Sequence, residues 1–206
     1  MLGFYNYTVV LTYVGMLTGF AGILFAAGGQ VSPALLCLLG AGFCDMFDGK
    51  IASTRPRTQQ EKRFGIQIDS LSDLVCFGVL PAVIVWCAAG ASPLSLCVGG
   101  GYALCALIRL AWFNVDEEER QAAEPGSRTL YYGLPVTGSA LILPGVLALA
   151  VRLGLAMAMP GLAALCLMAV GFLTPFPLKK PQAAGKAAGV ASMFAGAKGN
   201  AYTEAC

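Results

Sequence analysis

Long apolar stretches broken by short polar segments are the dominant pattern of this sequence. Asp, Glu, Lys and Arg are absent from four stretches, each at least as long as a bilayer span of roughly 20 residues: 1–44, 74–108, 129–151 and 153–178. Turn-forming residues divide the first two stretches, near Gly28 and Gly29 and near Ser92 and Pro93. The pattern therefore predicts six membrane spans, at 8–27, 32–47, 68–89, 93–114, 134–151 and 155–174.

These spans are predicted to be α-helices, because lipid offers the backbone no hydrogen-bond partner and barrel strands would alternate in polarity. Composition agrees, since 57% of the 206 residues are hydrophobic and only 12% are charged. We expect an all-α integral membrane protein in which residues 1–181 form one six-helix transmembrane domain. Residues 182–206 are rich in Ala, Gly and Lys and are expected to form a mobile tail.

Basic residues indicate how the spans are oriented. They gather between the second and third spans, between the fourth and fifth, and after the sixth, whereas Arg152 stands alone on the opposite side. The positive-inside rule then predicts a multi-pass protein of the cell membrane with both termini and the polar window at 44–73, which contains four aspartates, facing the cytoplasm. We interpret 50–64 as a polar loop and 116–119 as a solvated acidic loop. A net charge of +2 gives no indication of nucleic-acid binding.

Four aspartates lie together in the polar window between the second and third spans: Asp45, Asp48, Asp69 and Asp73. Helical spacing places the first pair on one helix face and the second pair on another. Because a short linker makes the two spans antiparallel neighbours, the two acidic faces can meet. Isolated acids near a span end are ordinarily helix caps or solvated charges, and that remains the alternative interpretation.

Converging carboxylates repel one another unless cations join them, so a divalent metal is the simplest remedy. The ligands are hard oxygens and the chain has no histidine, which favours Mg²⁺ or Mn²⁺, with Ca²⁺ as a further candidate, over zinc. Two ions would clamp a phosphate or pyrophosphate. Without histidine, a carboxylate must also act as general base, and Asp73, one turn deeper than Asp69, is the candidate.

Two motifs follow one another in this window: Asp45-x-x-Asp48-Gly49-x-x-Ala52 and Gly65-x-x-x-Asp69-x-x-x-Asp73. Together they resemble the signature of the CDP-alcohol phosphotransferase family. The runs 69–82, 109–114 and 133–135 are similar to the phosphatidylserine synthase branch of that family. The similarity covers roughly residues 6–181.

The resemblance implies a six-helix membrane enzyme, commonly a homodimer, whose metal site binds the pyrophosphate of a CDP-linked lipid. It implies CDP-diacylglycerol and L-serine as substrates, with phosphatidylserine and CMP as products. It further implies that the first three motif aspartates are metal ligands and that the fourth lies at the metal site as the proposed base. Small residues that let the nucleotide pack closely are expected at Gly49, Ala52 and Gly65, beside Asp48.

One position departs from the family pattern, which usually has arginine directly after the motif alanine. Ser53 occupies that position here, and Arg55 is the candidate replacement for the nucleotide contact. Trp112 is a milder departure, because many relatives have arginine there.

Substrate contacts are also expected from Arg109 and Asn114. Arg109 is a basic residue inside a predicted span, where charge is costly unless paired or used. It could snorkel to the interface or pair with a motif aspartate, and the alternative is an anchor for phosphate or for the serine carboxylate. Asn114 could line the acceptor pocket. Gly15 and Gly19, in contrast, are interpreted as helix-packing positions.

Two other functions stay open. A family member that uses glycerol phosphate or inositol phosphate as acceptor would need further basic residues for the second phosphate. A non-catalytic transporter or cation-binding scaffold would have the acid cluster by coincidence.

Overall fold

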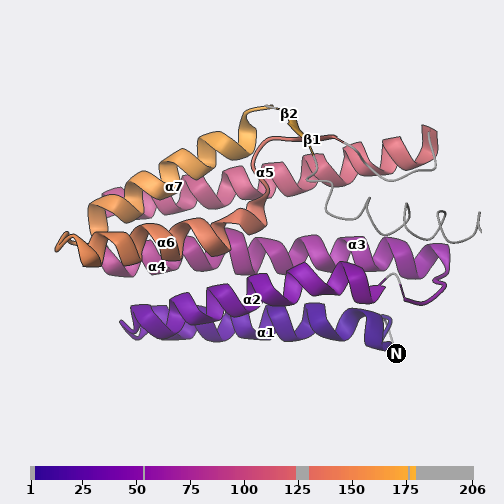
Figure 1. Cartoon of the computed structure of the whole chain (residues 1–206), viewed down its shortest axis with the longest axis horizontal. Coiled ribbons are helices and arrows are strands. Elements are labelled where there is room, and N and C mark those ends of the chain that lie inside the picture. The colour runs from indigo at the N-terminus through magenta and orange to yellow at the C-terminus, as the bar shows by residue number, and fades with distance from the viewer. Residues whose placement is uncertain (1–2, 53, 124–129, 176, 180–206) are drawn as a thin grey trace, which may run out of the picture.

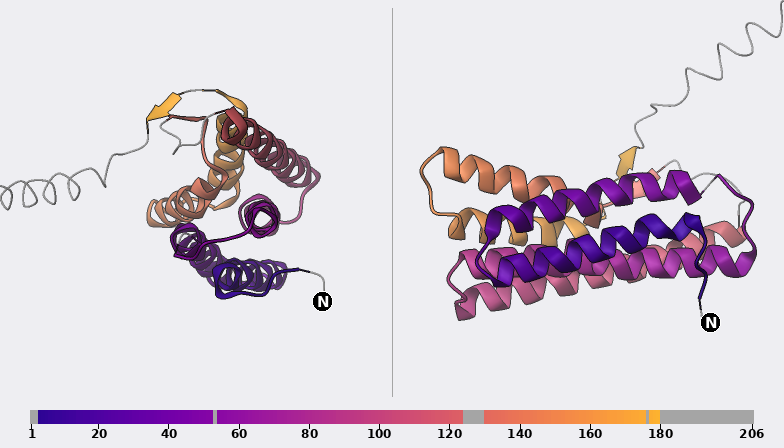
Figure 2. Two further views of the ribbon diagram at one scale, coloured as in Figure 1. Left: turned by 90° about the vertical axis from the view of Figure 1, so that its right-hand side faces the viewer. Right: turned by 90° about the horizontal axis from the view of Figure 1, so that it is seen from below.

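The computed structural model describes residues 3–52, 54–123, 130–175 and 177–179, which form six helical rods packed lengthwise in one bundle (Figures 1 and 2). The rods are α1 (Tyr7–Ala27), α2 (Val31–Ala52), α3 (Gln59–Asp73) with α4 (Leu80–Ala88), α5 (Pro93–Ala123), α6 (Ser139–Arg152) and α7 (Ala158–Leu173). A π-helical segment, Leu74–Val79, joins α3 to α4, and a 3₁₀ turn, Val136–Gly138, precedes α6. Two short antiparallel strands, β1 (Leu130–Tyr132) and β2 (Pro177–Lys179), pair Tyr131 with Leu178.

The helical, multi-pass character of the chain is confirmed. Four helices are long and apolar enough to cross a membrane: Tyr7–Ala27, Val31–Gly49, Gln59–Ala88 and Pro93–Glu119. Val136–Arg152 and Ala158–Leu173 are apolar but shorter. That these last two also span the bilayer stays a prediction, and the expected tail at 182–206 lies outside the described residues.

Two segments that were expected to be loops are helical in part or throughout. The loop predicted at 50–64 is shorter than expected, because α2 continues to Ala52 and α3 begins at Gln59. Thr58 starts α3 with a capping box, in which its hydroxyl accepts from the Glu61 backbone N–H while the Glu61 carboxylate accepts from the Thr58 N–H. The acidic run 116–119 lies inside α5, because Glu, Arg, Gln and Ala all favour the helix.

One backbone carbonyl in the π-helical segment after Asp73 lacks its regular helical donor, because Pro81, four residues after Phe77, has no N–H. The Phe77 carbonyl accepts hydrogen bonds from the Tyr102 hydroxyl at 2.6 Å and from the Ser139 hydroxyl at 3.2 Å. In an apolar environment a backbone group that leaves the regular helical pattern needs such partners. These bonds tie α5 and α6 to the rod that contains the aspartates.

Glycines set the distance between helices, as the sequence indicated for Gly15 and Gly19. A β-carbon on Gly15 would lie 3.2 Å from the Cβ of Cys44, and one on Gly19 would lie 3.3 Å from the Cα of Cys76. Gly42 meets α6 in the same way, with a would-be β-carbon 2.7 Å from the Cβ of Ala140. The α1–α2 and α2–α6 contacts therefore depend on backbones that approach closely.

Gly42→Ala is expected to destabilise the bundle by about 1–3 kcal/mol, because α2 and α6 must separate to admit the methyl group. Thermal unfolding in detergent micelles, followed by circular dichroism, measures the loss. Gly101→Ala is the matched control, since a β-carbon there meets nothing within 4 Å. Equal melting temperatures for the two variants would contradict the close α2–α6 approach.

Candidate metal and nucleotide site

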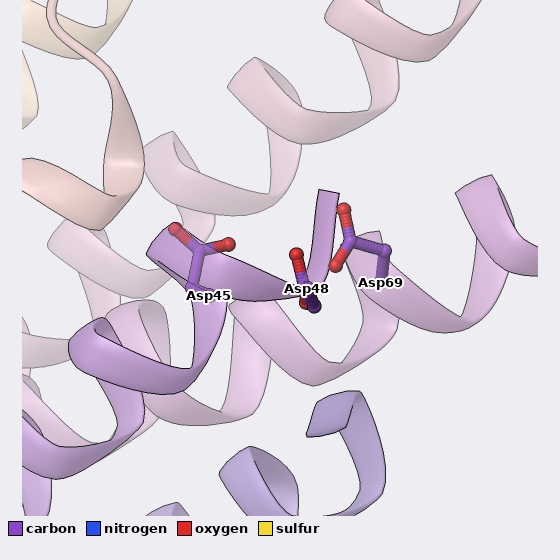
Figure 3. Close-up of side chains that lie close together, drawn as sticks. All are labelled: Asp45, Asp48 and Asp69. Carbon is purple, nitrogen blue, oxygen red and sulfur yellow. The ribbon is translucent and has the colours of Figure 1, made fainter. Parts of the chain in front are cut away.

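Three aspartates from two helices converge in the bundle. Asp45 and Asp48 lie on α2 and Asp69 on α3, and one carboxylate oxygen from each lies within 4.8 Å of the others (Figure 3). Asp48 is only 8% exposed, while Asp45 and Asp69 are half-buried. The chain passes from α2 to α3 through a short connection at one end of the bundle (Figure 1), and Asp69 lies in the second half of α3. Side chains that are far apart in sequence thus form one acidic cluster.

Asp73 lies beside this cluster rather than within it. Its side chain lines the same cavity as the three clustered aspartates. This narrow cavity is lined by all four aspartates together with Thr12, Gly15, Ala41, Ser72, Cys76 and Phe77. Among the described residues, that lining contains no lysine or arginine. Because several buried carboxylates need a compensating cation, this donor set fits one or more hard divalent ions.

A threonine from α1 completes the cluster, and sequence reasoning missed it. The Thr12 hydroxyl donates to Oδ2 of Asp48 at 3.2 Å, and both side chains are buried. The Ser72 hydroxyl in turn donates to the Thr12 carbonyl at 3.5 Å. The Thr12 hydroxyl helps to fix the orientation of the Asp48 carboxylate, as partners behind metal ligands commonly do. The available signal was the pair of polar residues Thr8 and Thr12, four apart on one face of an apolar helix.

A second cavity, of about 150 Å³, adjoins the aspartate cavity and shares Thr12, Asp48 and Asp69 with it. Gly49 and Gly65 lie in its lining, as expected for small positions beside a ligand. A β-carbon on Gly49 would meet nothing within 4 Å, so the space next to Asp48 is open. The other lining residues are Thr8, Val9, Arg57 and Ile66.

The remaining positions expected to bind nucleotide are Ala52 and Arg55. Ala52 is the last residue of α2, and Ser53 lies outside the described residues. Arg55 is absent from the lining of the 150 Å³ cavity; its guanidinium lies 3.9 Å from Oε1 of Glu61. The basic residue that does line this cavity is Arg57.

The two residues expected to contact substrate are not brought into the aspartate cavity. Arg109 lines a separate cavity of about 530 Å³ between α5 and the end of α7, together with Trp112, Phe172 and Thr174. Its guanidinium carbon lies 5.8 Å from the ring centre of Phe113.

Asn114 contacts the helix that bears Asp69. Its Oδ1 accepts a hydrogen bond at 3.0 Å from the hydroxyl of Ser70, the neighbour of Asp69 in sequence. Asn114 thereby ties α5 to α3, and it also lines a polar cavity with Gln59, Lys62, Arg63, Ile66, Gln67, Glu117 and Glu118.

Comparisons with known proteins agree with the motif. Residues 5–176 match the family model described as CDP-alcohol phosphatidyltransferase. A CDP-diacylglycerol–serine O-phosphatidyltransferase of Mycobacterium tuberculosis is 30% identical over 146 residues, which cover 70% of this chain and 49% of the relative. The Saccharomyces cerevisiae protein of the same name is 34% identical over 155 residues, covering 69% and 54%.

An archaetidylserine synthase of Methanothermobacter thermautotrophicus is 34% identical over 107 residues, covering 52% of this chain and 46% of the relative. The chain thus spans about half the length of the curated relatives that it matches.

Proposed function

This chain belongs to the CDP-alcohol phosphatidyltransferase family, and from that premise we propose that it transfers the phosphatidyl group of CDP-diacylglycerol to L-serine. The products are phosphatidylserine and CMP. The observation that carries the proposal is the cluster of Asp45, Asp48 and Asp69 within 4.8 Å, next to a cavity with room for a phosphate group. Carboxylates placed so close together suit a reaction on a metal-bound pyrophosphate.

The donor lipid is expected to bind with its pyrophosphate next to these three aspartates, and Asp73 joins them at the metal site. Mg²⁺ or Mn²⁺ held there would neutralise charge that develops on the phosphate oxygens. Gly49 and Gly65 would leave room for the nucleotide. Thr12 would hold Asp48 in place through its hydroxyl.

Asp73 is proposed as the general base. It would accept the proton of the serine hydroxyl while that oxygen forms a bond to the phosphorus that bears diacylglycerol. The bond between this phosphorus and the CMP oxygen breaks, and the electron pair leaves with CMP. Asp73 suits this role because it lines the same cavity as the cluster and is not one of the three converging carboxylates.

Serine is proposed as the acceptor because of the similarity in sequence. Two of the relatives described above are named as serine O-phosphatidyltransferases and a third as an archaetidylserine synthase. Acceptors with a phosphate of their own would need additional cations. Among the described residues, the two cavities that adjoin the aspartates have one basic lining residue, Arg57.

The site is proposed to face the cytoplasm. Arg55, Arg57, Lys62 and Arg63 all lie at the bundle end where α2 meets α3, the arrangement that the positive-inside rule associates with the cytoplasmic side. A homodimer is proposed from the family resemblance alone.

An acceptor screen tests the proposed reaction. The full chain in mixed micelles should release CMP from labelled CDP-diacylglycerol only when L-serine and Mg²⁺ or Mn²⁺ are both present, and the label should appear in phosphatidylserine. Glycerol 3-phosphate and inositol phosphate serve as competing acceptors. Release without serine would exclude serine as acceptor, and no release with any acceptor would favour a transporter or scaffold.

A further inference from the structure

Arg57 stands in an unusual place for a residue of a surface connection. It belongs to the segment between α2 and α3 and is only partly exposed. Its side chain lines the 150 Å³ cavity together with Asp48, Asp69 and Gly65. A β-carbon on Gly65 would lie 3.2 Å from its Nη1 atom, so the guanidinium rests against the helix turn that precedes Asp69.

The connection that bears Arg57 is held by hydrogen bonds to the N-terminal part of the chain. Nδ2 of Asn6 donates to Oε1 of Glu61 at 2.8 Å, and Glu61 closes the capping box with Thr58. The hydroxyls of Tyr7 and Thr54 lie 3.1 Å apart. These contacts fix both sides of residue 57, so its side chain is directed by the fold rather than by its own sequence neighbours.

The neighbouring arginines, Arg55 and Arg63, face glutamates instead of the cavity lining. Arg55 faces Glu61, and Arg63 pairs with Glu118 at 3.3 Å on the exposed side of the bundle. Neither of these ion pairs involves Arg57. Among the residues that the structure describes, Arg57 supplies the one basic side chain in the lining of a cavity that also contains two carboxylates.

That charge arrangement fits a specific kind of ligand. A pyrophosphate would bring further negative charge next to Asp48 and Asp69, so it needs cationic partners in the cavity. The guanidinium of Arg57 offers paired N–H donors in the fork geometry that matches phosphate oxygens. A neutral ligand would make no use of it.

We propose that Arg57 binds the pyrophosphate of the CDP-linked lipid, donating hydrogen bonds to phosphate oxygens within the cavity that it shares with Asp48 and Asp69; this inference rests on the proposed function. Arg57 thereby selects for the diphosphate part of the donor rather than for serine. It takes over the contact that the sequence led us to expect from Arg55.

Steady-state kinetics of Arg57→Gln test the inference. A charge-assisted hydrogen bond of the usual strength predicts a rise in KM for CDP-diacylglycerol of roughly ten- to a hundredfold. The KM for serine should change less than twofold. Arg57→Lys keeps the charge but loses the fork, so its KM should lie between those of the wild type and Arg57→Gln. Arg63→Gln is the matched control, because Arg63 is exposed and pairs with Glu118.

Calorimetric titration with CDP in the presence of Mn²⁺ gives a second readout that needs no turnover. Arg57→Gln should weaken CDP binding by a similar factor and should do so more strongly than Arg55→Gln. An unchanged CDP affinity, or a larger loss in Arg55→Gln, would overturn the inference. If Arg57→Gln fails to fold, Arg57→Lys decides, since wild-type CDP affinity in that variant excludes a forked contact.

The outcomes for the inference and for the proposed function are separate. If CMP release does not depend on serine but CDP binding still depends on Arg57, serine is excluded as the acceptor and the proposed pyrophosphate contact stands. If CMP release depends on serine but CDP binding does not depend on Arg57, the reverse holds.

Discussion

Asp73→Asn is expected to lower the turnover of CDP-diacylglycerol and serine by about 10²–10⁴-fold, the usual contribution of a positioned general base. Asparagine has nearly the same shape as aspartate but cannot accept the serine proton. Because Asp73 lies outside the cluster of three converging carboxylates, metal binding and donor binding should survive the substitution. The loss should therefore appear in kcat and leave the KM for CDP-diacylglycerol nearly unchanged.

Two measurements separate this base role from a structural one. Mn²⁺ binding by electron paramagnetic resonance and CDP binding by calorimetry should both match the wild type. Asp116→Asn, on the part of α5 beyond the apolar region, is a matched control for removal of one carboxylate at this end of the bundle. Wild-type turnover in Asp73→Asn would remove Asp73 as the base, and lost Mn²⁺ binding would make it a ligand instead.

Asp48→Asn should have an effect of comparable size with a different pattern. Asp48 is the most buried of the three clustered aspartates, and Thr12 already occupies one of its oxygens. Asparagine is neutral, so the substitution weakens or removes a metal ligand, and a lost group at a preorganised charged site costs about 10²–10³ in rate. Mn²⁺ affinity should fall together with turnover, and excess metal should restore part of the activity.

Together, the two variants separate loss of the general base from loss of a metal ligand. Asp73→Asn should change turnover without changing metal affinity, whereas Asp48→Asn should change both. In Asp48→Asn, the Thr12 hydroxyl would donate to a neutral amide oxygen instead of a carboxylate, so that hydrogen bond should also weaken. Unchanged Mn²⁺ affinity in Asp48→Asn would show that the three converging carboxylates do not hold the metal.

Much of the architecture could be predicted because its cause is local. Apolar stretches of span length identify the helices α1, α2 and α5, whose bounds lie close to those expected, except where polar residues prolong α2 and α5 beyond the apolar part. The polar extensions were missed because solvent-exposed helix turns depend on capping and propensity rather than on hydropathy, as Thr58 and Glu61 illustrate.

The site was predictable in part for the same reason. Aspartates three and four residues apart share a helix face whatever the rest of the chain does, so the meeting of Asp45, Asp48 and Asp69 followed from spacing and a short connection. Nothing local could place Thr12 against Asp48, because the two residues are 36 positions apart and belong to helices whose rotation is set by glycine contacts.

The sequence by itself thus determined a helical membrane protein with an acidic cluster where the second and third helices meet, since periodicity and spacing act within a few helical turns. Only the tertiary structure decided which side chains surround that cluster. Bonds between distant segments, such as Asn6 to Glu61, direct Arg57 into the cavity and Arg55 away from it. Packing of α5 against α7 likewise places Arg109 in a cavity of its own. Such choices depend on contacts across the bundle, which residue order along one helix does not encode.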